Sequence, residues 1–260
     1  MKAAIVIIGI GELAGVFARG FLRCGHPVFP ITRDMNLAEQ SQEIPTPAMV
    51  LITVQENKLH AMLEQIPDCW RNKIALVQNE LFPRDWQKHK IQNPSVTVVW
   101  FEKKKKLELT NILYSPCYGP NAQLISNALM TLEISAPILY SYEEILYELV
   151  RKALYILTVN IAGLVNNCTV EDLWFKSQPL ATEIAEEVIS ILEFLAEKKL
   201  PREKLINGMV EGIKDCPDRY CLGRSALERL KRALNHAQKA NIQTPKLLEI
   251  YQLVNHKDSD

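Results

Sequence analysis

The first 33 residues constrain the fold of this 260-residue chain more than any other stretch. An apolar run at 3–8 leads directly into Gly9-Ile10-Gly11-Glu12-Leu13-Ala14, which fits the pattern G-x-G-x-x-G/A. The first glycine of that pattern permits a tight turn, the second lets backbone approach a pyrophosphate, and the third small residue lets a helix lie close on the sheet. A helix predicted over 13–24 would point its positive N-terminal end at the phosphates. The stretch therefore predicts a strand, a turn and a helix with a dinucleotide site at residues 9–14.

A cleaved export signal is the alternative explanation for the same residues. Lys2 and the apolar run after it imitate the first two regions of such a signal, but the run is short, Glu12 interrupts it and no small-x-small cleavage site follows. No later run approaches the ~18 consecutive apolar residues that a membrane span needs. We therefore expect a cytoplasmic protein without a membrane segment.

Composition narrows the range of partners. Thirty Lys and Arg balance thirty Asp and Glu, so no global field would attract nucleic acid or an anionic membrane. The six cysteines are scattered without a C-x-x-C pair, which predicts reduced thiols and no metal site. The run EKKKK at 102–106 stands between two strand-like segments, and we interpret it as a solvated hairpin turn rather than a polyanion contact.

Two different patterns divide the chain. In the first part, apolar runs at 3–8, 28–32, 49–54, 74–78 and 96–101 alternate with helical patterns, which is typical of a parallel sheet covered on both faces. Pro30 predicts an edge or a bulge for the second of these strands. After residue 140, apolar residues recur at helical spacing. We predict the α/β class: a Rossmann-type doubly wound parallel sheet over 1–140, followed by an all-helical domain over 141–260.

The residues after the second predicted strand indicate which nucleotide binds. The strand ends in Thr32-Arg33-Asp34. Arg33 at this place can pair with a 2′-phosphate through its planar guanidinium, which favours NADP(H). If the strand ran one residue longer, Asp34 would hold a ribose 2′-hydroxyl and favour NAD instead. An ordinary surface arginine is the third interpretation of Arg33.

Taken together with the helical half, the chain resembles the ketopantoate reductase family, the NADPH-dependent reductases of 2-dehydropantoate. The resemblance is carried by GIGELAG, GHPVFPITR, IALVQNELF, LYELVRKALYILTVNIAGLVNN and LNHAQKANIQTPKLLEIYQLV, and it covers most of the chain. It implies a Rossmann domain joined to a helical domain, and hydride transfer from NADPH to the carbonyl of a small 2-oxo acid. It also implies that Asn79 lies near the nicotinamide, with Glu80 in place of the usual glycine.

The resemblance further implies the catalytic and substrate-binding residues. Lys152 falls at the family's lysine, whose ammonium stabilises or protonates the developing alkoxide, and Asn160 falls at its second asparagine. Residues eight apart lie about 80° apart around a helix, so both can border one cleft. Ser225 falls at the family's substrate-binding glutamate, and one small gap would place Glu228 there instead. A surface lysine is the alternative for Lys152.

Three departures from the family pattern put ketopantoate turnover in doubt. Ile156 replaces the family's first asparagine, Gln55 replaces a lysine after the third strand, and Ser225 replaces the glutamate. Each lost polar contact to a charged partner costs about 1.5–3 kcal/mol. The alternative function is therefore a catalytically impaired NADP(H)-binding relative that acts as a sensor or scaffold. A homodimer is an open alternative for the assembly, and the motifs of imine-reducing or 6-phosphogluconate-type dehydrogenases are not found in the sequence.

Overall fold

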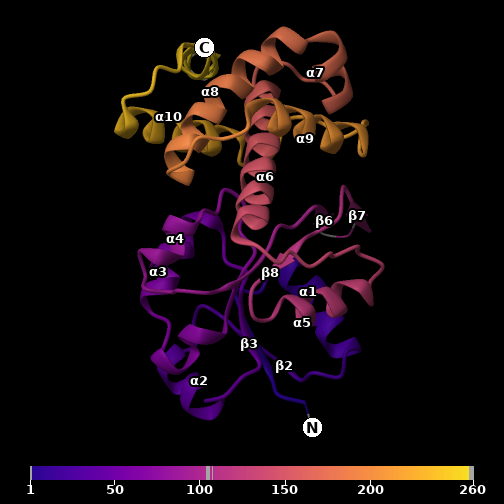
Figure 1. The fold of residues 1–260 in the computed structure, drawn as a ribbon, viewed down its shortest axis with the longest axis vertical. Coiled ribbons are helices and arrows are strands. Elements are labelled where there is room, and N and C mark those ends of the chain that lie inside the picture. Colours follow the sequence, from indigo (N-terminus) through magenta and orange to yellow (C-terminus); the bar gives the residue numbers. More distant parts are fainter. Residues whose placement is uncertain (1, 104–105, 107, 258–260) are drawn as a thin grey trace. The chain divides into compact units, whose positions relative to one another are not determined.

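A computed structural model describes residues 2–103, 106 and 108–257 of the chain (Figure 1). It divides into two compact units, Met1–Leu149 and Val150–Asp260. The division falls inside helix α6 (Tyr142–Gly163), whereas the boundary expected from the sequence, residue 140, lies just before this helix begins. Each unit is described by itself.

A six-stranded sheet forms the first unit. Its order is β2-β1-β3-β4-β5-β8, in which the first five strands are parallel and β8 runs antiparallel to β5. The strands are β1 (Ile5–Ile8), β2 (Val28–Ile31), β3 (Met49–Ile52), β4 (Ile74–Leu76), β5 (Ser95–Thr97) and β8 (Cys117–Tyr118). Because the second strand lies on one side of the first and the third on the other, the chain reverses its winding between β1 and β3. This arrangement confirms the predicted doubly wound sheet.

Strand β2 forms one edge of this sheet, as Pro30 predicts. Its residues pair only with β1 in the strand order, with Pro30 opposite Ile7. Proline has no N–H to donate to a second neighbour, so an edge strand tolerates it and a central strand does not. Phe29 and Pro30 are accordingly exposed, whereas Ile31 is buried.

Alternate residues of the central strands face opposite sides of the sheet. Residues such as Ile5, Ile7 and Leu51 join one core with Phe17 and Phe21 of helix α1 (Glu12–Arg23), and residues of α5 (Ala122–Met130) complete it. Figure 1 shows α1 and α5 on one side of the sheet. On the other side lie α2 (Leu37–Glu43), α3 (Leu59–Glu64) and α4 (Pro83–Gln87), with 3₁₀ turns at Glu56–Lys58 and Asp68–Lys73.

Helices α1 and α5 cross at very close range. A Cβ atom on Gly20 would lie 2.6 Å from the carbonyl oxygen of Ala128, so the crossing requires glycine at this position. A second, two-stranded sheet pairs β6 (Phe101–Lys103) with β7 (Leu109–Asn111) in antiparallel register. The hairpin turn predicted for 102–106 belongs between these strands, but residues 104 and 105 lie outside the described part of the chain.

Helices build the second unit, as predicted. After α6 come α7 (Val170–Lys176), α8 (Gln178–Ala196), α9 (Arg202–Lys214), α10 (Ala226–Ala240) and α11 (Pro245–Lys257). The apolar stripe of α8 is buried, including Ile184, Val188 and Ile191. One isolated antiparallel bridge, Thr169–Tyr220, links two of the connecting segments. Among the described helices of both units, none is long and apolar enough to cross a membrane.

Candidate functional site

The glycine turn lies where β1 ends, at the reversal point of the sheet. Gly9 has φ +92°, and a Cβ there would lie 2.9 Å from Val54 Cγ1, so only glycine fits without strain. Its N–H donates to the carbonyl oxygen of Ile31 at the end of β2 (3.1 Å). A Cβ on Gly11 would meet nothing within 4 Å, which leaves open space above the first turn of α1. The turn therefore combines a fixed backbone with an accessible helix N-terminus, the arrangement that binds phosphate groups.

The residues around the two glycines divide into buried and accessible positions. Ala14 lies on the side of α1 that faces the sheet, and it is buried in the core there, as the third position of the motif requires. Ile10 and Glu12 are exposed, and Leu13 is partly buried. The Glu12 carboxylate therefore reaches solvent, and the backbone rather than this side chain forms the surface that a phosphate would contact.

Thr53 holds the glycine turn from the neighbouring strand. It follows β3 directly, and its Oγ1 donates to the carbonyl oxygen of Gly9 (2.5 Å) with a second contact to that of Ile8 (3.1 Å). Its N–H also donates to the Ile8 carbonyl oxygen (2.9 Å). Thr53 was not identified from the sequence. The signal that could have found it was a hydroxyl side chain that ends the apolar run VLIT.

Arg33 and Asp34 occupy an exposed turn after β2. The strand ends at Ile31, one residue earlier than predicted, so it reaches neither residue. The N–H of Met35 donates to the carbonyl oxygen of Thr32 (3.2 Å), which closes the turn around them. Both side chains are exposed beside the carboxyl end of the sheet, and the choice between NADP and NAD remains a prediction.

The loop after β4 joins the same edge of the sheet. Gln78 Nε2 donates to the carbonyl oxygens of Ile52 (2.7 Å) and Val54 (3.2 Å), which ties this loop to the one after β3. Asn79 Nδ2 donates to Glu56 Oε1 (3.1 Å). Glu80 has φ +56°, so the chain keeps the left-handed backbone that suits glycine at the position where the family pattern has one.

These contacts bring residues 9–14, Thr53 and Asn79 together along the carboxyl ends of parallel strands, with the turn containing Arg33 beside them. In doubly wound sheets, ligands bind outside the carboxyl ends of the strands at the reversal point. Here that point lies between β1 and β3, where Thr53 contacts the Gly9 turn. The first unit thus places the glycine turn and the N-terminus of α1 at the edge where doubly wound sheets bind their ligands.

In the second unit, Lys152 is a buried residue of α6. Its side chain is 6 % exposed, and Nζ lies 5.7 Å from the centre of the Tyr155 ring. The guanidinium carbon of Arg219 lies 5.9 Å from the same ring centre. Burial raises the pKa of Tyr155, so its hydroxyl remains protonated beside these two cations. Lys152 is therefore not the surface lysine that the sequence left open.

Asn160, eight residues further along α6, is 4 % exposed, and both ends of its amide are engaged. Its Nδ2 donates to the carbonyl oxygen of Cys221 (3.2 Å), and its Oδ1 accepts from Arg229 Nη1 (3.1 Å). A Cβ on Gly223 would lie 2.5 Å from that Oδ1, so the segment after Cys221 packs directly on the amide. Asn160 thereby joins α6 to the segment before α10 and to α10 itself.

Arg229 was also missed at the level of sequence. It is 7 % exposed and lies on the buried side of α10, which otherwise consists of Ala226, Leu230, Ala233 and Ala237. The signal that could have identified Arg229 was its place in the apolar stripe of α10, because a charged residue is rarely buried without a partner. One partner of Arg229 is Asn160, which lies 69 positions earlier in the chain.

The remaining predicted positions lie at the surface or carry apolar groups. Ser225 is exposed immediately before α10, and its carbonyl oxygen accepts the N–H of Arg229 (2.9 Å). The alternative residue, Glu228, is also exposed and pairs with Lys231 (3.1 Å). Ile156 is buried and has no polar group to offer a substrate. Gln55 is the residue before the 3₁₀ turn after β3.

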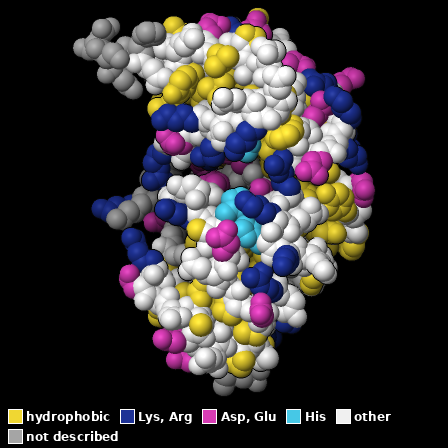
Figure 2. Space-filling view, turned by 90° about the vertical axis from the view of Figure 1, so that its left-hand side faces the viewer, with side chains coloured by type: hydrophobic (Ala, Val, Ile, Leu, Met, Phe, Trp, Pro, Cys, Tyr) yellow, Lys and Arg dark blue, Asp and Glu magenta, His cyan; other side chains and the backbone are white. Residues whose placement is uncertain are grey.

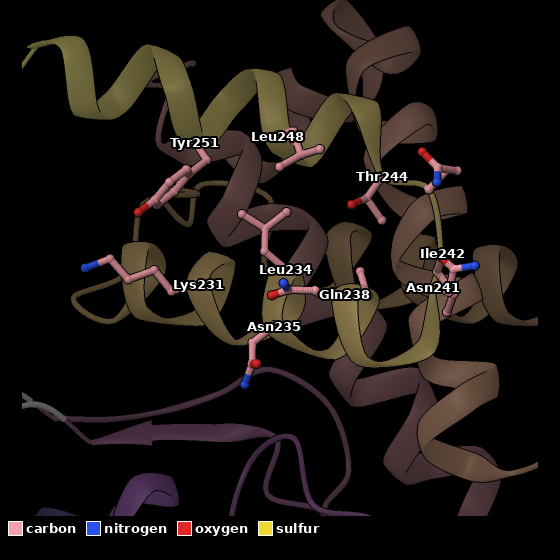
Figure 3. Close-up of a pocket in the computed structure, with 11 residues that line it drawn as sticks. Lys231, Leu234, Asn235, Gln238, Asn241, Ile242, Thr244, Leu248 and Tyr251 are labelled. Atoms are coloured by element: carbon pink, nitrogen blue, oxygen red, sulfur yellow. The ribbon is translucent and has the colours of Figure 1, made fainter.

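A separate pocket of about 540 Å³ lies between α10 and α11 (Figure 3). Amide side chains such as Asn235 and Gln238, together with Leu248 and Tyr251, line it. None of the predicted catalytic or substrate-binding residues is among its lining. On the face in Figure 2, Lys and Arg side chains are interspersed with Asp and Glu, as the balanced composition predicts. Within the described ranges, no group of three or more His, Cys, Asp or Glu residues could hold a metal ion.

No protein-family model matches the chain, and no curated protein matches it either. Solved structures match over nearly its whole length. The 2-dehydropantoate 2-reductase from Methylococcus capsulatus has a TM-score of 0.68 and 13 % identity, with 98 % of this chain and 96 % of that chain covered. A dimeric ketopantoate reductase from Staphylococcus aureus has a TM-score of 0.68 and 15 % identity, with 97 % and 98 % covered.

A D-mandelate dehydrogenase in complex with NADH matches equally well, with a TM-score of 0.68, 15 % identity and coverage of 98 % and 99 %. These three neighbours are oxidoreductases, and two of them are reductases of 2-dehydropantoate (ketopantoate) by name. The resemblance seen in the sequence is confirmed at the level of the fold: this chain is a divergent protein with the ketopantoate reductase fold.

Proposed function

We propose that this protein is an NADPH-dependent reductase of a small 2-oxo acid, related to the 2-dehydropantoate 2-reductases. The observation that carries the proposal is the glycine turn at the reversal point of the sheet, with open space above Gly11. Two features support it. The fold is shared with enzymes named for 2-oxo acid reduction and 2-hydroxy acid oxidation, and a buried lysine lies on α6 at the position that the resemblance assigns to catalysis.

Each part of the proposed site has a distinct task. Bound NADPH would supply the hydride. Backbone N–H groups at the start of α1 would hold its pyrophosphate, Arg33 its 2′-phosphate, and Asn79 would lie near its nicotinamide. The Lys152 ammonium would stabilise or protonate the alkoxide oxygen that forms as the carbonyl is reduced. Asn160 would orient the substrate, directly or through Arg229.

The substrate is expected to differ from ketopantoate. Ile156 is buried and apolar where the family pattern has an amide, and Ser225 offers a hydroxyl where it has a carboxylate. A substrate hydroxyl that loses water on binding and finds no hydrogen-bonding partner in the site costs binding free energy. A 2-oxo acid without the hydroxyl of ketopantoate should therefore be reduced faster, and Ile156→Asn should improve ketopantoate reduction.

The decisive experiment follows NADPH oxidation with a panel of 2-oxo acids and compares Lys152→Met with the wild type. Methionine keeps the apolar stem that packs near Tyr155 and removes the ammonium. We expect kcat to fall at least ~10²-fold with NADPH affinity nearly unchanged, because only the support for the developing alkoxide is lost. Lys176→Met on α7 is the matched control, since that lysine is largely exposed and pairs with Asp172 at the surface. A Lys152→Met variant as active as the wild type would remove the lysine from the mechanism.

An NADP(H)-binding protein without turnover is the second candidate. The engagement of both ends of the Asn160 amide by Cys221 and Arg229 favours it, because that side chain already has partners within its own unit. Tight NADPH binding with no oxidation by any member of the panel would support this candidate over the reductase.

Assembly and location form the last part of the proposal. The Staphylococcus aureus neighbour is described as dimeric. We propose that this protein likewise forms a homodimer and that it acts in the cytoplasm. Light scattering should then give twice the 29.6 kDa mass of one chain. A mass of one chain at all concentrations would contradict the dimer.

A further inference from the structure

Two cysteines far apart in the sequence face each other in the second unit. The Sγ atoms of Cys168 and Cys221 lie 3.9 Å apart, and the two residues are 53 positions apart along the chain. The next residues, Thr169 and Tyr220, form an antiparallel bridge, and the N–H of Cys221 donates to the carbonyl oxygen of Cys168 (3.0 Å). Backbone pairing therefore fixes the two thiols opposite each other. Cys168 is partly exposed and Cys221 is fully buried.

We propose that Cys168 and Cys221 form a reversible disulfide by exchange with a low-molecular-weight disulfide such as oxidised glutathione. The bond needs a separation of about 2.05 Å between sulfurs whose Cα atoms are usually 4.4–6.8 Å apart. Residues opposite each other in an antiparallel pair lie within about 4.5–5.5 Å, which meets this requirement. Small side-chain rotations are then sufficient to join the sulfurs. The sequence predicted reduced thiols throughout, because spacing alone gave no pair.

The exchange proceeds in two balanced steps. The thiolate of Cys168 attacks one sulfur of the small disulfide, which forms a mixed disulfide and releases one glutathione thiolate. The Cys221 sulfur, after losing its proton, then attacks Sγ of Cys168 and releases the second glutathione. The protein loses two electrons and two protons, and the small disulfide gains them as two thiols. Cys168 reacts first because it is the member of the pair that reaches solvent.

The other cysteines lack such a partner geometry in their described surroundings. Cys69 is exposed in the first unit, and Cys117 is buried there, where burial raises the pKa of its thiol to about 12. Burial raises the pKa of Cys221 to about 12, and it also raises the pKa of Cys168 above its ordinary value. Neither thiol is therefore activated as a thiolate, and the partial exposure of Cys168 is what lets it meet the small disulfide first. The order of the two steps follows from this difference in access.

The proposed bond would fix the segment that packs on the end of α6. The carbonyl oxygen of Cys221 accepts from Asn160, and a Cβ on Gly163 would lie 2.5 Å from the backbone nitrogen of Leu222. Oxidation would therefore tie residues 219–223 covalently to the segment that contains Cys168, which follows α6, whereas in the reduced protein hydrogen bonds alone join the two segments. This inference does not depend on the proposed reductase activity.

The test uses the full chain with Cys69→Ser, which removes the exposed thiol that could link two molecules. The protein is incubated with oxidised glutathione, unreacted thiols are labelled with a maleimide, and disulfide-linked peptides are mapped by mass spectrometry. Two of the five remaining thiols should disappear together, in a peptide pair containing Cys168 and Cys221. Hydrogen exchange at 219–223 should become slower on oxidation and return to its starting rate with a thiol reductant.

Matched variants decide between this pair and other outcomes. In Cys168→Ser the linked peptides should vanish and Cys221 should stay unlabelled by glutathione, whereas Cys216→Ser should leave the bond intact. Circular dichroism establishes that each variant is folded. A stable glutathione adduct on Cys168 with Cys221 still free, a link between Cys216 and either cysteine, or five free thiols after oxidation would each overturn the proposal.

Discussion

At the scale of single residues, the two glycines of the opening motif have different requirements. Gly9 needs glycine for its own backbone, because φ is +92° and a Cβ would lie 2.9 Å from Val54 Cγ1. Gly11 has no such constraint, since a Cβ there meets no protein atom within 4 Å and its backbone is extended. The packing of this unit therefore does not require glycine at position 11.

This difference predicts opposite outcomes for two matched substitutions. Gly11→Val should abolish NADPH binding and leave the unfolding temperature nearly unchanged, because valine fills the space that the pyrophosphate needs. Gly9→Val should lower the free energy of unfolding by about 1–3 kcal/mol or more, since a side chain at positive φ is strained. Fluorescence titration and thermal unfolding measure the two effects. Full NADPH affinity in a folded Gly11→Val protein would show that the motif has only a structural role.

Arg33 permits a second test at this scale. Arg33→Ala should weaken NADPH binding by about 1.5–3 kcal/mol, the value of a charge-assisted contact, and should barely change NADH binding. Asp34→Ala, in the same exposed turn, is the matched control and should affect neither nucleotide strongly. If the wild type binds NADPH and NADH equally, or if Asp34→Ala selectively weakens NADH, the NADP assignment is wrong.

At the scale of elements, Asn160 connects α6 with α10 and with the segment that precedes α10. Asn160→Ala would leave the Cys221 carbonyl and the Arg229 guanidinium without this partner, so the free energy of unfolding should fall by about 2 kcal/mol. Asn160→Asp should lose less, because a carboxylate can still accept from Arg229. Urea unfolding measures both variants.

Asn166→Ala is the control for this element-scale prediction. The Asn166 amide donates to Ser177 Oγ (3.0 Å), a neutral contact that is only partly buried. Its loss should cost about 1 kcal/mol or less. If Asn160→Ala and Asn166→Ala lower the free energy of unfolding equally, the contact between α6 and α10 contributes no more to stability than an ordinary hydrogen bond.

At the scale of the whole molecule, stability should decline on the acid side of neutrality. Burial is the main cause that lowers the pKa of His89 from its ordinary 6.5. Electrostatic interactions with His60, Lys88 and Arg71 lower this pKa further, whereas Glu64 acts against them. His60 Nδ1 lies 2.8 Å from His89 Nε2, so protonating both rings breaks their hydrogen bond. As the pH is lowered, His89 therefore takes up its proton at a higher pH in the unfolded chain than in the folded chain.

The sign of the effect follows from this order of protonation. Below pH 6.5 the unfolded state gains the proton first, so the free energy of unfolding falls as the pH is lowered from 6.5 towards the folded-state pKa of His89. His89→Gln should flatten this part of the profile in urea unfolding between pH 7 and pH 5. If the free energy of unfolding of His89→Gln changes with pH as steeply as that of the wild type, groups other than His89 cause the pH dependence.

The sequence alone was sufficient for features that local pattern determines. Short apolar runs marked the buried strands, and repeats with a period of 3.6 marked the helices. Pro30 marked an edge strand, and the spacing of two glycines and Ala14 after an apolar run marked the turn at the end of β1. These features depend on residues within one or two elements, so short-range geometry decides them. The kind of fold followed from their order.

Only the tertiary structure showed which distant side chains meet. Thr53 closes on the Gly9 turn, Arg229 reaches Asn160, and Cys168 faces Cys221. It also showed that Lys152 is buried and that Ser225 is exposed, although each follows an arginine and precedes Ala-Leu in the sequence. These pairs lie 44 to 69 positions apart along the chain. Partners at such separations are chosen by how elements pack, because local propensity acts only over a few residues and carries no information about which distant side chain arrives opposite.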